Sequence, residues 1–468
     1  MKRKLILLLF VLPAVVNHSQ AQENTSVNWK RIYKVAEAIK EPLFPEKIYK
    51  ITDYGAVPDG KTKNTDPINN AIRDCSSKGG GTVLVSGGKF LTGPVHLRSN
   101  VNLKIAESAT LVFSTDPKDY LPLVQTRWEG NDCYNYSPLI YANGQTNFAI
   151  TGNGKIDGQG SKINWWPWKG HPAYGWQKNT PSQLNADGRP LLDEWEKKQV
   201  PVEKRQMGEG HYLRPQLINF IHCKDVLIKD VTLLNSPFWV IHPLLSENVI
   251  IRSVSINSLG PNSDGCDPES CKNVLIEDCT FNTGDDCIAL KSGRNSDGRR
   301  AGKPIENVLI RNCRMKNGHG GVVLGSEISG GCKNIFVENC KMDSPELERA
   351  IRIKTNSHRG GITDGVYIRD LEIGQVKEAI LKINCAYDPS EGQGNFPPLV
   401  KNVFISGVNS QNAPYAINMT GIEGKNSIEN IFLTNCHFNG VKNDNKISQA
   451  KNVILREVFI NNKKVELN

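Results

Sequence analysis

The sequence lacks a hydrophobic run long enough to cross a membrane. Its main apolar stretch, Leu5–Val16, is shorter than the about 20 residues that a membrane-spanning helix needs. There is also no tract of clustered basic residues and no nucleic-acid-binding motif. A net charge of +9 over 468 residues is too diffuse to indicate a nucleic-acid partner. We therefore expect neither nucleic acid nor a membrane anchor.

The first residues have the three parts of an export signal. Basic residues 2–4 precede the apolar run, and Ser19-Gln20-Ala21 supplies small residues for cleavage. No cysteine follows that site, so a lipid anchor is not indicated. Residues 1–21 are predicted to be a signal peptide for a periplasmic or secreted protein. Their removal lowers the net charge from +9 to +6, which is compatible with an acidic partner.

A seven-residue phrase recurs along the second half of the chain, at spacings of 22 to 37 residues. It opens with asparagine in most copies and has apolar residues at its second and fourth positions. Period-two alternation of β-branched residues predicts a strand, a turn and a second strand in each copy. Repeats of this size indicate stacked coils, here an all-β parallel β-helix. The copies start at Asp225, Asn248, Asn273, Asn307, Asn334, Gly365, Asn402, Asn430 and Asn452.

The seventh position of the phrase bears on the 12 cysteines. It holds cysteine, valine or leucine interchangeably, so it is an inward-facing apolar position in which a free thiol acts as a small hydrophobe. We predict unpaired core thiols there rather than disulfides. The opening asparagines could form a ladder of side-chain amides between coils. The cysteines concerned are Cys279, Cys313, Cys340 and Cys436.

The rest of the chain fits around this stack. Trp29, Ile32, Ala36 and Ile39 fall at helical spacing, which predicts that segment 22–48 contains a short helix capping the open end of the stack. Residues 49–468 are then expected to be a single catalytic β-helix domain. A stretch at about 161–211 fits no repeat and is interpreted as a surface excursion, either a lid or an insertion.

Four polar clusters interrupt consecutive coils: Asn262-Ser263-Asp264, Gly284-Asp285-Asp286, Gly318-His319-Gly320 and Arg352-Ile353-Lys354. Asp285 and His319 each lie twelve residues after the asparagine of their own copy. Equal offsets place them at the same angle on adjacent coils, about 4.8 Å apart. Each cluster alone is typical of an ordinary turn or solvated strand. Their joint occurrence, one per coil, predicts a shared site.

Clustered carboxylates raise one another's pKa values, so one can stay protonated while another is ionised. Glycoside hydrolysis needs this division, because one acid protonates the leaving oxygen while a carboxylate activates water or attacks the sugar. Arg352 and Lys354 share one strand face and could bind the carboxylates of an anionic sugar.

The ordered set of four clusters resembles the polygalacturonase family, glycoside hydrolase family 28, from about Tyr54 through the last repeats. Ser263 departs mildly from the usual Asn-Thr-Asp form. The resemblance implies a right-handed parallel β-helix and inverting hydrolysis of pectin-type polymers of galacturonic acid, without a metal or other cofactor. It also implies an acid–base separation of roughly 6.5–9.5 Å, whereas a separation of about 5 Å would indicate retention and contradict the implied catalytic roles.

The resemblance further implies roles for single residues. Asp285 is the general acid, Asp264 and Asp286 hold the attacking water, and His319 tunes the acid. Arg352 and Lys354 bind sugar carboxylates, and Asn262 supports the site. Further candidates for substrate binding are Lys291, Arg294, His358 and Tyr387.

Several alternatives stay open. A calcium-dependent pectate lyase shares the coils and the substrate, and clustered carboxylates could bind calcium. A non-catalytic carbohydrate-binding β-helix is possible on fold alone. Among hydrolases, rhamnogalacturonan and xylogalacturonan are rival backbones. The excursion and a Gly-rich loop at 294–303 could close one end of the cleft, which favours exo attack. We expect a monomer.

Overall fold

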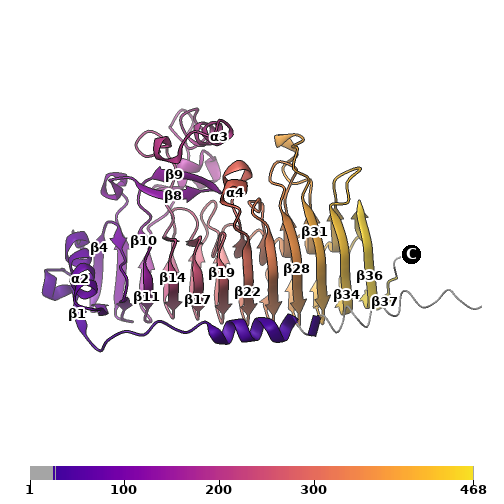
Figure 1. Cartoon of the computed structure of the whole chain (residues 1–468), viewed down its shortest axis with the longest axis horizontal. Coiled ribbons are helices and arrows are strands. Elements are labelled where there is room, and N and C mark those ends of the chain that lie inside the picture. Colours follow the sequence, from indigo (N-terminus) through magenta and orange to yellow (C-terminus); the bar gives the residue numbers. More distant parts are fainter. Residues whose placement is uncertain (1–24, 27, 467–468) are drawn as a thin grey trace, which may run out of the picture.

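The computed structural model describes residues 25–26 and 28–466 and forms an elongated stack of coils, a right-handed parallel β-helix (Figure 1). The predicted signal peptide lies outside the described residues. In the described part of the chain, no helix combines the length and the apolar character that a membrane crossing requires. Each coil contributes up to three short strands, so the stack has three faces.

The first face consists of parallel strands that each pair with the same strand of the next coil. They are β1 (Ile48–Lys50), β3 (Gly81–Val85), β6 (Val101–Ile105), β11 (Thr146–Thr151), β14 (Lys224–Lys229), β17 (Glu247–Arg252), β19 (Lys272–Glu277), β22 (Ile305–Arg311), β25 (Cys332–Glu338), β28 (Ile362–Arg369), β31 (Leu399–Ser406), β34 (Ile428–Phe438) and β36 (Ala450–Ile460).

The second face follows after a sharp turn. Its strands are β2 (Asp59–Lys63), β4 (Gly88–Thr92), β7 (Ala109–Phe113), β12 (Lys155–Asp157), β15 (Thr232–Leu234), β18 (Ser255–Ser258), β20 (Thr280–Thr283), β23 (Arg314–Met315), β26 (Lys341–Met342), β29 (Glu372–Gln375) and β32 (Asn409–Asn412). The short β37 (Lys463–Lys464) runs antiparallel to the end of β36.

The polar clusters lie where the chain enters the third face. Isolated bridges through Cys266 and Glu269 join its two runs of strands into one face. The strands are β5 (Val95–His96), β10 (Ile140–Asn143), β13 (Ile218–Ile221), β16 (Ile241–Leu244), β21 (Ile288–Leu290), β24 (Val322–Leu324), β27 (Arg349–Lys354), β30 (Ala379–Asn384), β33 (Tyr415–Thr420) and β35 (Lys446–Ser448).

Inward-facing apolar side chains stack in register along the interior. Val249, Val274 and Val308, all from the second position of the phrase, are Cα partners on successive coils. Each is almost completely buried. Burial of one such side chain contributes roughly 1.5–3 kcal/mol. The strong alternation of the phrase therefore fixes the register of the stack.

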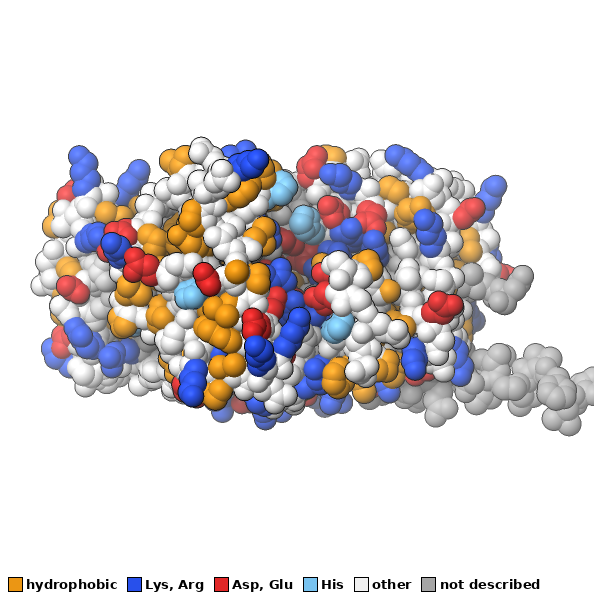
Figure 2. All heavy atoms as spheres, turned by 90° about the horizontal axis from the view of Figure 1, so that it is seen from above, with side chains coloured by type: hydrophobic (Ala, Val, Ile, Leu, Met, Phe, Trp, Pro, Cys, Tyr) orange, Lys and Arg blue, Asp and Glu red, His pale blue; other side chains and the backbone are white. Residues whose placement is uncertain are grey.

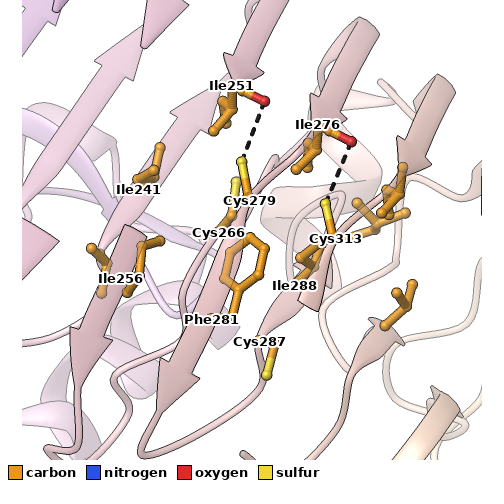
Figure 3. Packing of buried hydrophobic residues seen from close by; sticks show 14 of the residues in the cluster. Ile241, Ile251, Ile256, Cys266, Ile276, Cys279, Phe281, Cys287, Ile288 and Cys313 are labelled. Carbon is orange, nitrogen blue, oxygen red and sulfur yellow. Dashed lines mark hydrogen bonds between the residues drawn. The ribbon is translucent and has the colours of Figure 1, made fainter. Parts of the chain in front are cut away.

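The cysteine prediction is confirmed, since all 12 cysteines are buried free thiols. Figure 3 shows Cys279 and Cys313 inside the stack, packed among isoleucines. Their Sγ atoms lie 3.6 Å from the Ile251 carbonyl oxygen and 3.8 Å from the Ile276 carbonyl oxygen. The seventh position thus fills the apolar core.

The asparagine ladder is also confirmed. The Nδ2 of Asn273 donates to Oδ1 of Asn248 at 3.1 Å, and Asn307 repeats the contact with Asn273 at 3.1 Å. These asparagines have positive φ angles near +56° to +58°. Asparagine tolerates this left-handed conformation better than most residues, which explains its recurrence at the turn.

The N-terminal helix, residues 28–38, exists as predicted, but its predicted place over the open end is wrong. It lies lengthwise along the first face, below the coils in Figure 1. Trp29 and Ile32 pack with outward-facing residues of that face, including Leu309 and Phe336. The helix binds there because the third position of the phrase is apolar and outward-facing. The end near β1 instead contacts helix α2 (Thr65–Ser77) and the 3₁₀ turn η1 (Ile51–Tyr54).

The excursion rises above the third face as a separate layer (Figure 1). This layer consists of residues 159–215 and of the antiparallel hairpin formed by β8 (Val124–Trp128) and β9 (Asn131–Asn135). The segment predicted as a Gly-rich loop at 294–303 instead contains helix α4 (Asn295–Ala301). A buried Arg205–Asp297 ion pair ties α4 to the excursion. The remaining helical pieces are η2 (Pro117–Tyr120), η3 (Trp166–Lys169), η4 (Pro172–Tyr174), α3 (Arg189–Lys197), η5 (Val202–Lys204) and η6 (Pro389–Glu391).

Candidate active site

Three consecutive coils bring the predicted acids and histidine to one corner of the stack. Asp285 and His319 stand three residues before Ile288 and Val322, which are Cα partners in the third face. The backbone N–H of His319 donates to the Asp285 carbonyl oxygen at 3.1 Å, and that of Gly265 donates to the Asp286 carbonyl oxygen at 2.9 Å. The equal sequence offsets therefore do place these residues side by side.

The carboxylates are closer together than the resemblance implies. One oxygen from each of Asp264, Asp285 and Asp286 lies within 4.8 Å of the other two. The expected separation of roughly 6.5–9.5 Å is therefore wrong for these oxygens. The physical reason is that neighbouring coils set the spacing, and parallel strands lie about 4.8 Å apart.

Asp285 and His319 form a hydrogen-bonded pair. Nδ1 of His319 lies 2.9 Å from Oδ1 of Asp285. This hydrogen bond and the Asp285 charge raise the pKa of His319 to about 9. Burial pushes the pKa of Asp285 upward, but the His319 hydrogen bond and charge, together with the charges of Lys354 and Lys291, hold that pKa below its usual range. At neutral pH the pair therefore carries one proton, on the imidazole.

The pKa of Asp264 is shifted in the opposite direction from that of Asp285. Asp264 is buried, and burial together with the charges of Asp267 and Asp285 raises its pKa well above the ordinary value. Asp267 is fully buried, and neither of its carboxylate oxygens has a hydrogen-bond partner among the described residues. The predicted site residue Lys291 neutralises this group, with Nζ 3.7 Å from Asp264, 3.6 Å from Asp267 and 3.1 Å from Glu327.

Asp286 is held by the two cations of β27. Nζ of Lys354 donates to its Oδ2 at 2.8 Å, and Nη1 of Arg352 lies 3.6 Å from its Oδ1. Oδ1 is buried and accepts no hydrogen bond from the described residues. Tyr387 joins this group, with both cations about 5.5 Å from its ring centre. Arg352 and Lys354 thus contact one of the predicted catalytic carboxylates besides lining the cleft.

Asn262 is fixed by cations from the excursion side. Its Oδ1 accepts hydrogen bonds from Nζ of Lys169 and Nη2 of Arg214, both at 2.9 Å. Beside it, the Ser263 and Ser258 hydroxyls lie 2.7 Å apart, so the serine supports the turn. Neither Lys169 nor Arg214 was predicted as a site residue, because neither belongs to a repeat copy.

Two predicted substrate contacts lie away from the cleft wall. Arg294 is buried, with its guanidinium 3.0 Å from Glu391 and 3.8 Å from Glu129. His358 contributes its carbonyl oxygen to Arg299, and its Nε2 is buried. Both residues instead support the loops that border the site.

The cleft above these residues has a volume of about 330 Å³. Figure 2 looks onto this face and shows acidic, basic and histidine side chains around a hollow near the middle of the molecule. Arg359, which follows the Arg-Ile-Lys cluster and was a sequence candidate for contacting substrate, also lines the cleft. Sequence reasoning missed several other lining residues, most of which come from the excursion or from turns between strands. They are Glu129, Lys169, Arg189, Trp239, Ser326, Glu327, Glu348, Arg349 and Asp388.

Asp264, Asp285 and Asp286 are also the group of described residues that could share a metal ion. The ammonium groups of Lys354 and Lys291 contact the same carboxylates at 2.8 and 3.7 Å. These fixed positive charges oppose the binding of a cation. The arrangement favours proton transfer between acids and bases over metal coordination.

The comparisons with known proteins agree with this chemistry. A family model described as glycosyl hydrolases family 28 matches residues 180–454, and a model described as rhamnogalacturonase A/epimerase, pectate lyase-like, matches residues 48–106. The crystal structure of a hyperthermoactive exopolygalacturonase from Thermotoga maritima superimposes with a TM-score of 0.90 at 41% identity. It covers 93% of this chain and 97% of that one.

Curated relatives are more distant in sequence. A probable polygalacturonase from Vitis vinifera is 33% identical over 70% of this chain and 61% of its own length, so the chain spans less than two thirds of that relative. An exo-poly-α-D-galacturonosidase from Dickeya chrysanthemi is 27% identical over 84% of this chain and 68% of its own length. The chain therefore belongs to glycosyl hydrolases family 28.

Proposed function

We propose that this protein hydrolyses the α-1,4-galacturonosyl linkages of polygalacturonate, the acidic backbone of pectin, from a chain end. The observation that carries the proposal is the carboxylate trio within 4.8 Å, of which Asp264 and Asp285 line a cleft that also exposes arginine and lysine side chains. Acids of this kind cleave glycosidic bonds. The cations suit a polymer with a carboxylate on every sugar.

The proton for the leaving oxygen comes from the Asp285–His319 pair. In the unliganded protein this proton lies on Nδ1 of His319, 2.9 Å from Oδ1 of Asp285. An anionic sugar in the cleft raises the pKa of the nearby carboxyl. The proton then passes to Asp285 and on to the glycosidic oxygen as the bond between that oxygen and the anomeric carbon breaks.

The attacking water lies between Asp264 and Asp286. A water molecule hydrogen-bonded at about 2.8 Å to each of two oxygens fits between oxygens up to 4.8 Å apart. The free Oδ1 of Asp286 accepts its proton, and protonated Asp264 orients it. Direct attack by this water inverts the anomeric carbon. Attack by a carboxylate at this short separation would instead retain it, and the first product distinguishes the two.

Exo attack is supported by the residues that the hairpin and the excursion add to the cleft. Glu129, Lys169 and Arg189, all from the hairpin and the excursion, line the cleft beside Asn262. The buried Arg205–Asp297 pair fixes this layer to α4. The names of the Thermotoga and Dickeya relatives point to the same mode of action. We further propose that the protein is exported, on the basis of residues 1–21, and that it acts as a monomer.

Proton NMR of the first product tests the proposed mechanism. Digestion of trigalacturonate should first release β-galacturonic acid, which then mutarotates. Asp285→Asn should lose about 10²–10⁴-fold in kcat while still binding substrate, with the thermal unfolding temperature as a control for folding. First release of the α anomer contradicts inversion, and full activity of the variant contradicts the role of Asp285.

A further inference from the structure

Lys169 is a partly buried cation without a carboxylate partner. It lies at the end of η3 and lines the cleft. Its Nζ makes one hydrogen bond, to Oδ1 of Asn262 at 2.9 Å. Among the described residues, no carboxylate oxygen lies within 4.0 Å of it. An ammonium group has three N–H donors, so donor capacity remains.

The carboxylate with the strongest electrostatic effect on Lys169 already contacts other cations. Glu129 also lines the cleft, but its Oε2 lies 3.3 Å from Arg189 and 3.8 Å from Arg294. Burial lowers the pKa of Lys169, and Glu129 only partly opposes this. A buried charge without a partner is costly, so an anion entering the cleft gains by pairing with it.

The position of Lys169 complements the cations of β27. Nε1 of Trp166, in the same 3₁₀ turn, donates to the Ser236 carbonyl oxygen at 3.0 Å, so η3 lies over the coil before that of Asp264. The backbone of Arg352 lies three coils beyond that of Asp264, about 14 Å along the stack, and its guanidinium reaches back to Asp286. A chain that spans the catalytic carboxylates therefore has Lys169 on one side and Arg352 with Lys354 on the other.

We propose that Lys169 binds the carboxylate of the terminal galacturonate that is released, in the part of the cleft lined by the excursion. This inference rests on the proposed function and deepens it by naming the group that recognises the terminal sugar. Lys169 lies outside residues 180–454, which the family model matches. Specificity for a charged chain end then comes from the excursion rather than from the coils.

The test combines Lys169→Gln with trigalacturonates that carry one methyl ester, on the terminal sugar that is released or on the opposite terminal sugar. Glutamine keeps an N–H donor for Asn262 but removes the charge. For the unaltered enzyme, the ester on the released sugar should lower kcat/KM roughly 10- to 100-fold, as expected for the loss of a charge-assisted contact. In Lys169→Gln the same ester should lower kcat/KM by less than about 3-fold.

Lys169→Arg is the matched control and should still discriminate against that ester, whereas the ester on the opposite sugar should affect all three proteins equally. Equal sensitivity of Lys169→Gln and the unaltered enzyme to the ester on the released sugar would overturn the inference. Failure of the unaltered enzyme to cleave trigalacturonate would instead overturn the proposed function.

Discussion

At the residue scale, the active site is a set of charges whose balance decides where protons lie. The His319 imidazolium stabilises the ionised Asp285 carboxylate. The positive charge of Lys291 partly offsets the acidic groups of Asp264, Asp267 and Glu327. Burial strengthens the interactions of Lys291, because water screens them little, whereas the His319 ring stays partly exposed. Replacement of one member therefore changes the protonation of its neighbours as well as its own contact.

The pH dependence of catalysis should depend on His319. Because its pKa is raised to about 9, the imidazole is protonated below that pH and loses the proton as the pH rises through it. We expect kcat/KM to fall as the pH rises through about 9. His319→Gln should lower activity about 10²–10⁴-fold and remove this basic limb. His358→Gln, away from the cleft, should keep it. A limb near pH 9 that persists in His319→Gln contradicts the proton assignment.

Lys291 should be more important for stability than its acidic neighbours. Lys291→Met leaves buried acids without their cation, and we expect a loss of about 3–5 kcal/mol in the free energy of unfolding. Asp267→Asn is the comparison, because it removes a buried carboxylate whose pKa is raised well above its usual range. Its loss at pH 7 should be much smaller. Urea unfolding measures both variants, and equal losses contradict this charge balance.

Sequence reasoning reached only part of this residue set. The equal offsets of Asp285 and His319 were sufficient to pair them, because register along a stack converts sequence distance into position. Lys169 and Glu129 could not be predicted in that way. They reach the cleft from segments without a repeat, where sequence distance carries no information about position.

At the element scale, the N-terminal helix covers a surface that the repeat pattern alone did not identify. The third position of the phrase faces outward yet is apolar, as in Ile250, Leu275 and Phe336. An outward apolar column needs a cover, and this column was the available signal for a helix along the first face. Amphipathic spacing in residues 28–38 predicted a buried helix face, but the spacing alone does not identify the surface that it covers.

The contact of this helix with the stack should be separable from catalysis. Trp29 packs edge-on against Phe336 at 5.0 Å between ring centres, and the Arg369 guanidinium lies 4.0 Å from its ring centre. Trp29→Ala should lower the free energy of unfolding by about 3 kcal/mol with little change in kcat/KM. Lys34→Ala, exposed on the same helix, should change stability by less than about 0.5 kcal/mol. A large loss of kcat/KM in Trp29→Ala at a temperature where it is folded contradicts this separation.

At the scale of the whole molecule, the coils carry the candidate active site and the excursion adds further lining residues to the cleft. The three faces follow from one repeated phrase, and the four polar clusters mark the coils where the candidate site lies. The form of the excursion depends on contacts between segments far apart in sequence, such as Arg205 with Asp297. Such long-range pairing leaves no periodic pattern in the sequence. The sequence therefore predicted that an excursion exists but not how it packs.

The central claim is hydrolysis of polygalacturonate from a chain end, and a timed product profile tests it most directly. Early in the digestion, the account predicts saturated monogalacturonate as the only small product, with slow loss of viscosity. Rhamnogalacturonan and xylogalacturonan should release much less product under the same conditions. A ladder of oligomers at early times, or an unsaturated product that absorbs ultraviolet light, would contradict the account.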